Sequence, residues 1–271
     1  MTTGKIAGFR ARMLAGDFLA GTFLKTPSLE LIEVLALSGL DFICLDAEHA
    51  PFDRGRMDAC LAIGRALDFP ILVRVGSGTA ENILQAMDSG AVGIVVPHVY
   101  TVEKAEGIAK AARFGHHGRG YAGSTRWAGF TTNTMADLLE KSRNETVVIA
   151  QIEEPEGVEA AAGIAAVEGI DGLFVGPADL AVSFGVTDPN APVLQAALQK
   201  TGEASRAAGK CYMSFVPNAA KAADWVKYGM TMFFIGSEHS WMLNGARADA
   251  AGIHGLTAEH GMTAEHWLTK N

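Results

Sequence analysis

Residues 147–153 read Val147-Val148-Ile149-Ala150-Gln151-Ile152-Glu153, an apolar run that ends on an acidic residue. Seven further apolar or β-branched runs recur at fairly even intervals, at residues 21–24, 42–45, 71–75, 92–96, 172–175, 211–215 and 230–235. Apolar runs without a clean polar alternation are typical of parallel strands that are covered on both faces. The pattern therefore predicts eight parallel strands.

The segments between these runs have helical periodicity. Leu29, Ile32 and Leu35 are spaced three residues apart and are followed by Gly39, a residue type that commonly ends a helix. Strands that alternate with helices pair in parallel through crossover connections. Eight such units in 271 residues predict a single α/β domain with the (β/α)8 TIM barrel fold, which needs about 250 residues. An open doubly wound sheet is the main alternative.

The composition describes one globular domain. Apolar residues make up 49% of the chain and charged residues 19%, and no shift in composition marks a second domain. We expect a barrel core from about residue 18 to about residue 240 and a helical tail over residues 241–271. The tail repeats Thr-Ala-Glu-His at 257–260 and 263–266, and packing on another subunit is one use for it.

Charge and hydropathy narrow the class of partner. The formal net charge is −8 and no run of Lys or Arg stands out, which disfavours nucleic acids and anionic membranes and favours a small molecule. Residues 1–18 lack the apolar core of a signal peptide, and no apolar run reaches membrane-spanning length. Cys44, Cys60 and Cys211 show no metal-binding spacing, so we expect reduced thiols in a soluble, cytoplasmic protein.

One connection is longer than a simple barrel turn. Residues 113–132 are rich in glycine. Loops of this length serve as lids or assembly surfaces, or are simply mobile surface segments, and these readings stay open.

Catalytic groups of a parallel barrel gather at the carboxyl ends of its strands. Glu153 follows the fifth expected strand and Asp179 the sixth, so we expect the two carboxylates to converge there. Two hard oxygen ligands leave room for substrate or water oxygens around Mg²⁺ or Mn²⁺, as in a catalytic site. The alternative is that each acid caps the helix that follows its strand.

Asp46, Glu48 and His49 follow the second expected strand. An Asp three residues before a His across a turn is able to accept the imidazole N–H and fix its tautomer, which predicts proton transfer near neutral pH. We interpret Glu48 as a surface charge or a salt-bridge partner. His98, after the fourth strand, is interpreted as structural.

Arg74 interrupts the third apolar run, and a buried guanidinium requires an anionic partner. A carboxylate substrate or a developing enolate fits that requirement, and so does a structural pair with Asp46 or Glu48. Lys25 is the lysine placed for Schiff-base chemistry, although the helix start at Thr26-Pro27 favours exposure to solvent. The sequence contains neither a dinucleotide fingerprint nor a phosphate loop, which disfavours nucleotide cofactors.

Four motifs resemble the HpcH/HpaI aldolase/citrate lyase family of metal-dependent, pyruvate-class aldolases. In chain order they are Leu45-Asp46-Ala47-Glu48-His49-Ala50-Pro51, Val73-Arg74-Val75, Gln151-Ile152-Glu153 and Val175-Gly176-Pro177-Ala178-Asp179-Leu180. The resemblance runs from about the first expected strand to the eighth. It implies a (β/α)8 barrel, usually a homohexamer built as a dimer of trimers, with the last helix exchanged between subunits.

The resemblance also implies a metal site with a proton-transfer pair beside it. Glu153 and Asp179 would hold a divalent cation (Mg²⁺, Mn²⁺ or Co²⁺). Gln151 would lie beside the metal and its substrate. His49 and Asp46 match the family's proton-transfer pair.

The remaining expectations concern contacts with substrate. Arg74 matches the residue that holds the keto-acid oxygen, and a backbone N–H of the Gly176-Pro177-Ala178 turn would add a further contact. Ser124 follows the family's Gly-x-Arg-Gly loop element, and we expect it to contact substrate. Phe23 and Ser214 lie in regions where family members differ and where the aldehyde is contacted.

These roles together predict a class II, metal-dependent aldolase. It would reversibly cleave a 2-keto-4-hydroxy acid into pyruvate, or hydroxypyruvate, and an aldehyde. One alternative is a CoA-thioester lyase of the same superfamily. Another is a non-catalytic barrel that binds a metal and a keto acid, although such a protein would not require the Asp46 and His49 pair.

Overall fold

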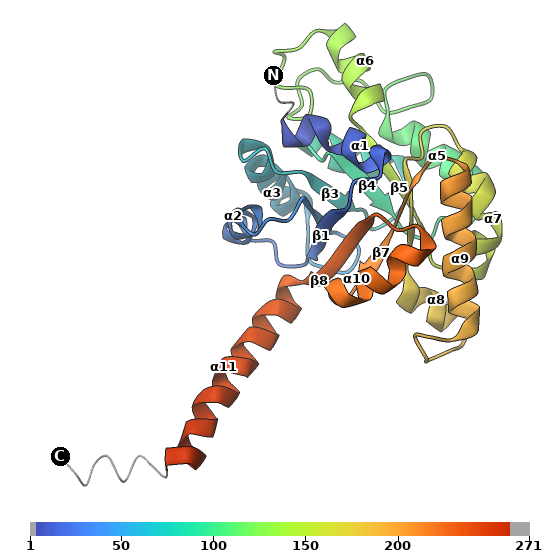
Figure 1. The fold of residues 1–271 in the computed structure, drawn as a ribbon. Coiled ribbons are helices and arrows are strands. Elements are labelled where there is room, and N and C mark those ends of the chain that lie inside the picture. Colours follow the sequence, from blue (N-terminus) through green and yellow to red (C-terminus); the bar gives the residue numbers. More distant parts are fainter. Residues whose placement is uncertain (1–3, 261–271) are drawn as a thin grey trace. The chain divides into compact units, whose positions relative to one another are not determined.

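The computed structural model describes residues 4–260 and shows a closed barrel of eight parallel strands with helices around it (Figure 1). The strands pair in chain order, and their bounds are β1 Leu19–Leu24, β2 Phe42–Asp46, β3 Ile71–Arg74, β4 Gly93–Val96, β5 Val147–Ile152, β6 Gly172–Val175, β7 Cys211–Val216 and β8 Met232–Ser237. Each predicted run coincides with a strand. The predicted barrel is therefore confirmed, and the open doubly wound sheet is wrong.

The helices occupy the connections between the strands and the two ends of the chain. Their bounds are α1 Lys5–Ala15, α2 Leu29–Leu37, α3 Arg54–Ala66, α4 Ala80–Ser89, α5 Val102–Ala112, α6 Met135–Asn144, α7 Pro155–Ala166, α8 Pro177–Ser183, α9 Pro192–Ala207, α10 Ala219–Trp225, the 3-10 turn η1 Val226–Tyr228 and α11 Glu238–His260. Short polar side chains start several of them. Ser28, for example, accepts the Leu31 N–H at the start of α2.

The strand register brings residues that are distant in sequence to the same level of the barrel. Asp46 at the end of β2 is the pairing partner of Arg74 at the end of β3. Between the first and last strands, the Leu19 N–H donates to Thr231 O at 2.8 Å. Because all the strands run in parallel, their carboxyl ends form one rim.

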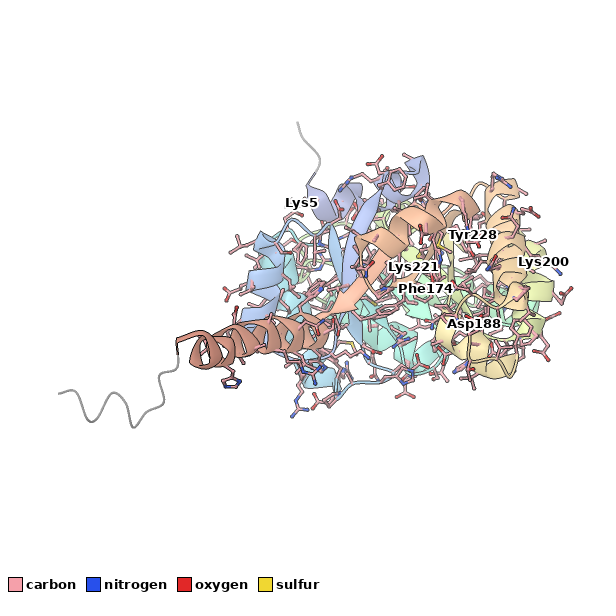
Figure 2. The ribbon with its side chains drawn as sticks, turned by 60° about the horizontal axis from the view of Figure 1, so that its bottom comes forward. Lys5, Phe174, Asp188, Lys200, Lys221 and Tyr228 are labelled. Carbon is pink, nitrogen blue, oxygen red and sulfur yellow. The ribbon has the colours of Figure 1, made fainter. Side chains whose placement is uncertain are left out.

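Alternate residues of each strand point into the barrel, where aromatic rings fill the interior. The Phe23 ring centroid lies 4.9 Å from that of Phe234 and 6.0 Å from that of Phe174, which Figure 2 labels within the barrel. Phe9 and Met13 of α1 belong to the same buried cluster. Helix α1 therefore covers the amino end of the barrel.

The other residues of each strand face the helices. Ile43, Val73 and Val148 are fully buried in this outer layer, together with Ile83 of α4 and Ile164 of α7. Burial of each such side chain contributes about 1.5 to 3 kcal/mol. Strands buried on both faces explain why their sequences lack a polar alternation.

The long segment between α5 and α6 is packed against the outer helices. The Arg119 side chain is fully buried, with its guanidinium carbon 4.0 Å from the Phe114 ring centroid and 4.4 Å from that of Trp127. Arg126 donates to Asp58 of α3 at 2.9 Å. These contacts order the segment within a single chain.

The chain divides into two compact units. One holds the barrel and ends at Gly236, and the other begins at Ser237 and contains α11. Helix α11 covers residues 241–260 of the expected tail, whereas the second copy of its repeat, at 263–266, lies outside the described residues. Among residues 4–260, no helix is long and apolar enough to cross a membrane. The three cysteines are buried free thiols.

Candidate active site

Side-chain alternation directs four polar residues into the carboxyl end of the barrel. Each of them lies an even number of positions along the chain from an interior residue of the same strand, such as Cys44, Leu72 or Ile149. The four residues are Asp46, Arg74, Gln151 and Glu153. All four are buried. The strand geometry thus gathers these predicted site residues at one level.

Arg74 and Asp46 form a buried bidentate ion pair. Arg74 donates from Nε to Asp46 Oδ1 at 3.0 Å and from Nη2 to Asp46 Oδ2 at 2.8 Å, while its guanidinium carbon lies 4.4 Å from the Phe23 ring centroid. Burial alone would raise the pKa of Asp46, but the bonds and charge of Arg74 outweigh it and lower that pKa. The structural pair expected as an alternative is therefore formed, and Nη1 remains for a further acceptor.

The predicted contact between Asp46 and the His49 imidazole is not formed. Asp46 Oδ1 instead accepts the backbone N–H of His49 at 3.1 Å, which closes the turn after β2. The His49 side chain is 58% exposed, and its Nε2 lies 3.7 Å from Glu48 Oε2. The prediction was wrong because the turn brings the His49 main chain, rather than its ring, to the carboxylate.

Glu153 is held by main-chain and side-chain donors. Its Oε2 accepts the His98 N–H at 2.9 Å, and its Oε1 accepts a short hydrogen bond from Gln151 Nε2. Burial raises the pKa of Glu153, and the negative charges of Asp179 and Glu48 raise it further against the effect of the His98 N–H. Such a carboxylate is stabilised by a nearby cation.

Glu153 and Asp179 flank the same empty side of Gly176. A Cβ at Gly176 would stand 3.1 Å from Glu153 Oε1 and 3.5 Å from Asp179 Oδ2. Neither acid caps a helix, because the N-cap residues of α7 and α8 are Glu154 and Gly176, and neither helix has a side-chain capping bond. The helix-cap alternative is therefore wrong for both residues.

The donor set beside Gly176 fits a divalent metal. Both carboxylates are hard oxygen ligands, and Gln151 Oε1 is a buried acceptor without a hydrogen-bond partner among the described residues. Within residues 4–260, no three or more His, Cys, Asp or Glu side chains form a complete metal site. Two carboxylates therefore match the expected arrangement, in which substrate or water oxygens supply the remaining ligands.

His98 belongs to this cluster, although its sequence context indicated only a structural residue. Its Nδ1 lies 2.6 Å from Glu154 Oε1 and 3.3 Å from Glu153 Oε2. Burial alone would lower the pKa of His98, but the hydrogen bond to Glu154 and the surrounding negative charges raise it. Its backbone has φ of 57°, and this left-handed geometry aims the N–H at Glu153. No sequence pattern signals that geometry.

Three residues that were predicted to contact substrate have other surroundings in the structure. Ser214 is fully buried, faces the outer layer and donates its hydroxyl to Val175 O at 2.7 Å, so the structure does not support a substrate contact for it. Phe23 is buried beneath Arg74. Ser124 is exposed in the segment between α5 and α6.

The turn at residues 176–178 retains one useful donor. The Gly176 N–H is already donated to Ile152 O at 3.0 Å, and Pro177 has no N–H. Ala178 lies in the first turn of α8, where backbone N–H groups lack helical acceptors. Of the turn that was predicted to supply a backbone N–H, only Ala178 is therefore placed to bind a substrate oxygen.

Lys25 lies at the edge of the same cluster. Its Nζ is 3.7 Å from Asp46 Oδ2, and its side chain is 37% exposed. Schiff-base lysines are activated by an apolar pocket or by a neighbouring cation. A partly exposed ammonium is not in an apolar pocket, and although Arg74 contacts the same Asp46 oxygen, the Asp46 carboxylate compensates both charges, which disfavours the Schiff-base alternative.

A cavity of about 730 Å³ lies elsewhere, between α5 and α7, and is lined by Arg10, Lys110, Arg113 and Arg143 among others. Arg10 and Arg113 both contact Asp171, with N–O distances of 2.6 and 2.7 Å. None of the predicted site residues lines this cavity. The predicted chemistry therefore stays assigned to the cluster at the carboxyl rim and not to this cavity.

Comparison with known proteins identifies one family and named relatives of this chain. The family model described as HpcH/HpaI aldolase/citrate lyase matches residues 19–245. A hydroxypyruvate/pyruvate aldolase from Delftia acidovorans is 32% identical over 89% of this chain and 90% of its own length. A 5-keto-4-deoxy-D-glucarate aldolase from an Enterobacter species is 33% identical over 85% and 90%.

Solved structures with the same fold include members of this group. An HpcH/HpaI aldolase/citrate lyase family protein from Burkholderia cenocepacia superposes with a TM-score of 0.86 and 30% identity, over 92% of this chain and 99% of that one. The citrate synthase SbnG superposes with a TM-score of 0.82 and 29% identity, over 92% and 98%.

Proposed function

Because the chain belongs to the HpcH/HpaI aldolase/citrate lyase family, we propose that this carbon–carbon lyase is a class II aldolase acting on 2-keto-4-hydroxy acids. The reaction reversibly breaks the C3–C4 bond and releases pyruvate or hydroxypyruvate and an aldehyde. The observation that carries the proposal is the approach of Glu153 and Asp179 to one space beside Gly176. Relatives named as pyruvate-class aldolases support this substrate class.

Glu153 and Asp179 would hold a divalent cation, Mg²⁺, Mn²⁺ or Co²⁺, and Gln151, which donates from Nε2 to Glu153, would lie beside it. When bound, such a cation supplies Lewis-acid stabilisation of the charge that develops on a keto-acid oxygen. The His98 N–H fixes the orientation of Glu153. Metal binding would also offset the mutual repulsion of the two carboxylates.

Arg74 and Ala178 would bind the keto acid. Asp46 holds Arg74 through Nε and Nη2, which presents Nη1 as a fixed cationic donor toward the rim. A preorganised donor of this kind stabilises developing negative charge without reorganisation. The Ala178 N–H adds a neutral donor at the start of α8.

His49 would move the proton of the 4-hydroxyl group. Its imidazole is exposed at the rim, so it is able to exchange protons with solvent. In the cleavage direction it accepts the hydroxyl proton as the C3–C4 bond breaks. In the synthetic direction it returns a proton to the new hydroxyl.

The proposed assembly is a homohexamer, a dimer of trimers in which α11 packs on a neighbouring copy. Support comes from the apolar side chains Trp241, Met242 and Ile253, which α11 exposes in a single chain. Ser124 would then reach a substrate only from a neighbouring copy. Light scattering after size-exclusion chromatography tests the assembly, and a monomer would contradict it. We expect the enzyme to act in the cytoplasm, where its buried thiols stay reduced.

The decisive experiment uses EDTA-treated protein with pyruvate or hydroxypyruvate and a panel of aldehydes. We expect aldol products only after Mg²⁺, Mn²⁺ or Co²⁺ is added. Absence of metal-dependent product with every aldehyde contradicts the proposal. A parallel reaction with acetyl-CoA and oxaloacetate examines the CoA-thioester alternative, for which the similarity to a citrate synthase is the specific support.

A further inference from the structure

Glu48 lies where the charged groups of the site meet. Its Oε2 is 3.3 Å from Arg74 Nε and 3.7 Å from His49 Nε2, while its Oε1 is 3.6 Å from His98 Nε2. Its negative charge also acts on Glu153. The side chain is only 10% exposed and is paired with Arg74, so of the two sequence interpretations of Glu48 the salt-bridge partner is confirmed and the surface charge is wrong.

Glu48 Oε2 is buried and accepts no hydrogen bond from the residues that the structure describes. Arg74 Nε does not satisfy it, because that nitrogen already donates to Asp46 Oδ1 at 3.0 Å. A buried carboxylate oxygen without a donor is costly. Two imidazoles lie nearby, but His98 is held through Nδ1 by Glu154 at 2.6 Å, so the 58% exposed His49 ring is the donor with freedom to move.

We propose that Glu48 is a positioning residue for proton transfer, and that it is the acid partner of the His49 imidazole in place of Asp46. A small rotation of the exposed ring, or one bridging water, converts the 3.7 Å approach into a hydrogen bond. Asp46 is occupied by Arg74 and by the His49 main chain. This inference rests on the aldolase function proposed above.

The pairing assigns roles to the two ring nitrogens of His49. With the Nε2 proton directed at Glu48, Nδ1 is the nitrogen with a lone pair and accepts the proton of the substrate hydroxyl. The imidazolium formed in that step is stabilised by the Glu48 carboxylate. Arg74 and His98 hold the carboxylate from the other side.

The test compares Glu48→Gln, which preserves shape and removes charge, with the wild-type protein. Three readouts are the aldol reaction, exchange of the C3 protons of pyruvate with deuterated water by NMR, and Mn²⁺ affinity by electron paramagnetic resonance. We expect kcat to fall about 10- to 100-fold, with unchanged KM for pyruvate and unchanged Mn²⁺ affinity. Glu203→Gln, at an exposed position on α9, is the matched control and should behave like the wild type.

A double variant shows whether Glu48 acts through His49. If it does, the Glu48→Gln/His49→Ala protein is no slower than His49→Ala alone, because the effects of residues that act as a unit do not multiply. Multiplied effects, or a loss of Mn²⁺ affinity in Glu48→Gln, overturn the inference. If Glu48→Gln fails to fold by circular dichroism, Glu48→Asp replaces it and should retain part of the activity.

Measurements on the wild-type protein distinguish a failure of the proposed aldolase function from a failure of the proposed role of Glu48. Absence of both proton exchange and aldol product in the wild type contradicts the aldolase function itself. A wild type that is active and a Glu48→Gln variant of equal kcat contradict only the role of Glu48.

Discussion

Arg74 donates a hydrogen bond to each carboxylate oxygen of Asp46, from Nε at 3.0 Å and from Nη2 at 2.8 Å. The two residues pair across β2 and β3, and Asp46 is fully buried. Each charge therefore depends on the other for compensation in a region of low dielectric constant. The same contact fixes Arg74, which among the described residues is the buried cationic group at the carboxyl rim, with the partly exposed Lys25 beside it.

Asp46→Asn should destabilise the protein strongly, because it removes the bidentate counter-charge of the buried Arg74 guanidinium and leaves only Glu48, whose Oε2 lies 3.3 Å from Arg74 Nε. We expect a loss of about 3 to 5 kcal/mol in the free energy of unfolding, measured with chemical denaturant. Asp17→Asn breaks an exposed pair with Arg12 and should cost at most about 1 kcal/mol. Equal losses in the two variants would contradict this account of the buried pair.

The contribution of Asp46 should disappear at acid pH. Its pKa is lowered in the folded protein, so it stabilises the fold above its unfolded pKa of about 3.9 and loses that effect as pH falls through the lower folded pKa. The stability difference between wild type and Asp46→Asn should be constant from about pH 7 to about pH 5 and shrink below about pH 4. A stability difference between the two proteins that grows as the pH falls would contradict a lowered pKa of Asp46 in the folded state.

Divalent metal should stabilise the folded protein through Glu153 and Asp179. At 100 times its dissociation constant, Mn²⁺ is expected to raise the free energy of unfolding by about 2.7 kcal/mol over EDTA-treated protein. Asp179→Asn should remove this effect, whereas Asp188→Asn, in the exposed connection between α8 and α9, should retain it. Stabilisation that survives in Asp179→Asn would place the metal elsewhere.

Gly176→Ala probes the space between the two acids. The added Cβ would stand 2.9 Å from Glu153 Cγ, which is too close for that side chain to stay in place. We expect Mn²⁺ affinity to fall about tenfold, by electron paramagnetic resonance. Gly107→Ala in α5 meets no atom within 4 Å and should leave the affinity unchanged and the helix slightly more stable. Wild-type affinity in Gly176→Ala would contradict the proposed geometry.

The fold could be predicted from the sequence because strands buried on both faces leave a strong local signal. Runs such as 147–152 and 172–175 have the same bounds in the sequence and in the structure. Once the strands are known, parallel pairing brings Asp46, Arg74 and Glu153 to one rim. The position of these residues thus follows from strand order and side-chain alternation alone.

The sequence predictions that failed depend on the position of a single residue in a strand or on the shape of a single turn. Ser214 stands between the interior residues Met213 and Phe215, so it must face the outer layer and cannot meet a ligand inside the rim. The spacing of Asp46 and His49 fits a contact to the ring and a contact to the main chain equally well, and the turn selects the main chain. The left-handed backbone of His98 is a tertiary feature without a local sequence signal.

The aromatic packing beneath Arg74 determines how solvent reaches the chemistry. Phe23, Phe174 and Phe234 fill the barrel under the guanidinium, and α1 covers the amino end with Phe9. The closed amino end leaves the carboxyl rim, where the His49 ring is exposed, as the side from which solvent reaches the site. Because the barrel is closed at its amino end, substrate, product and solvent share the opening at the carboxyl rim.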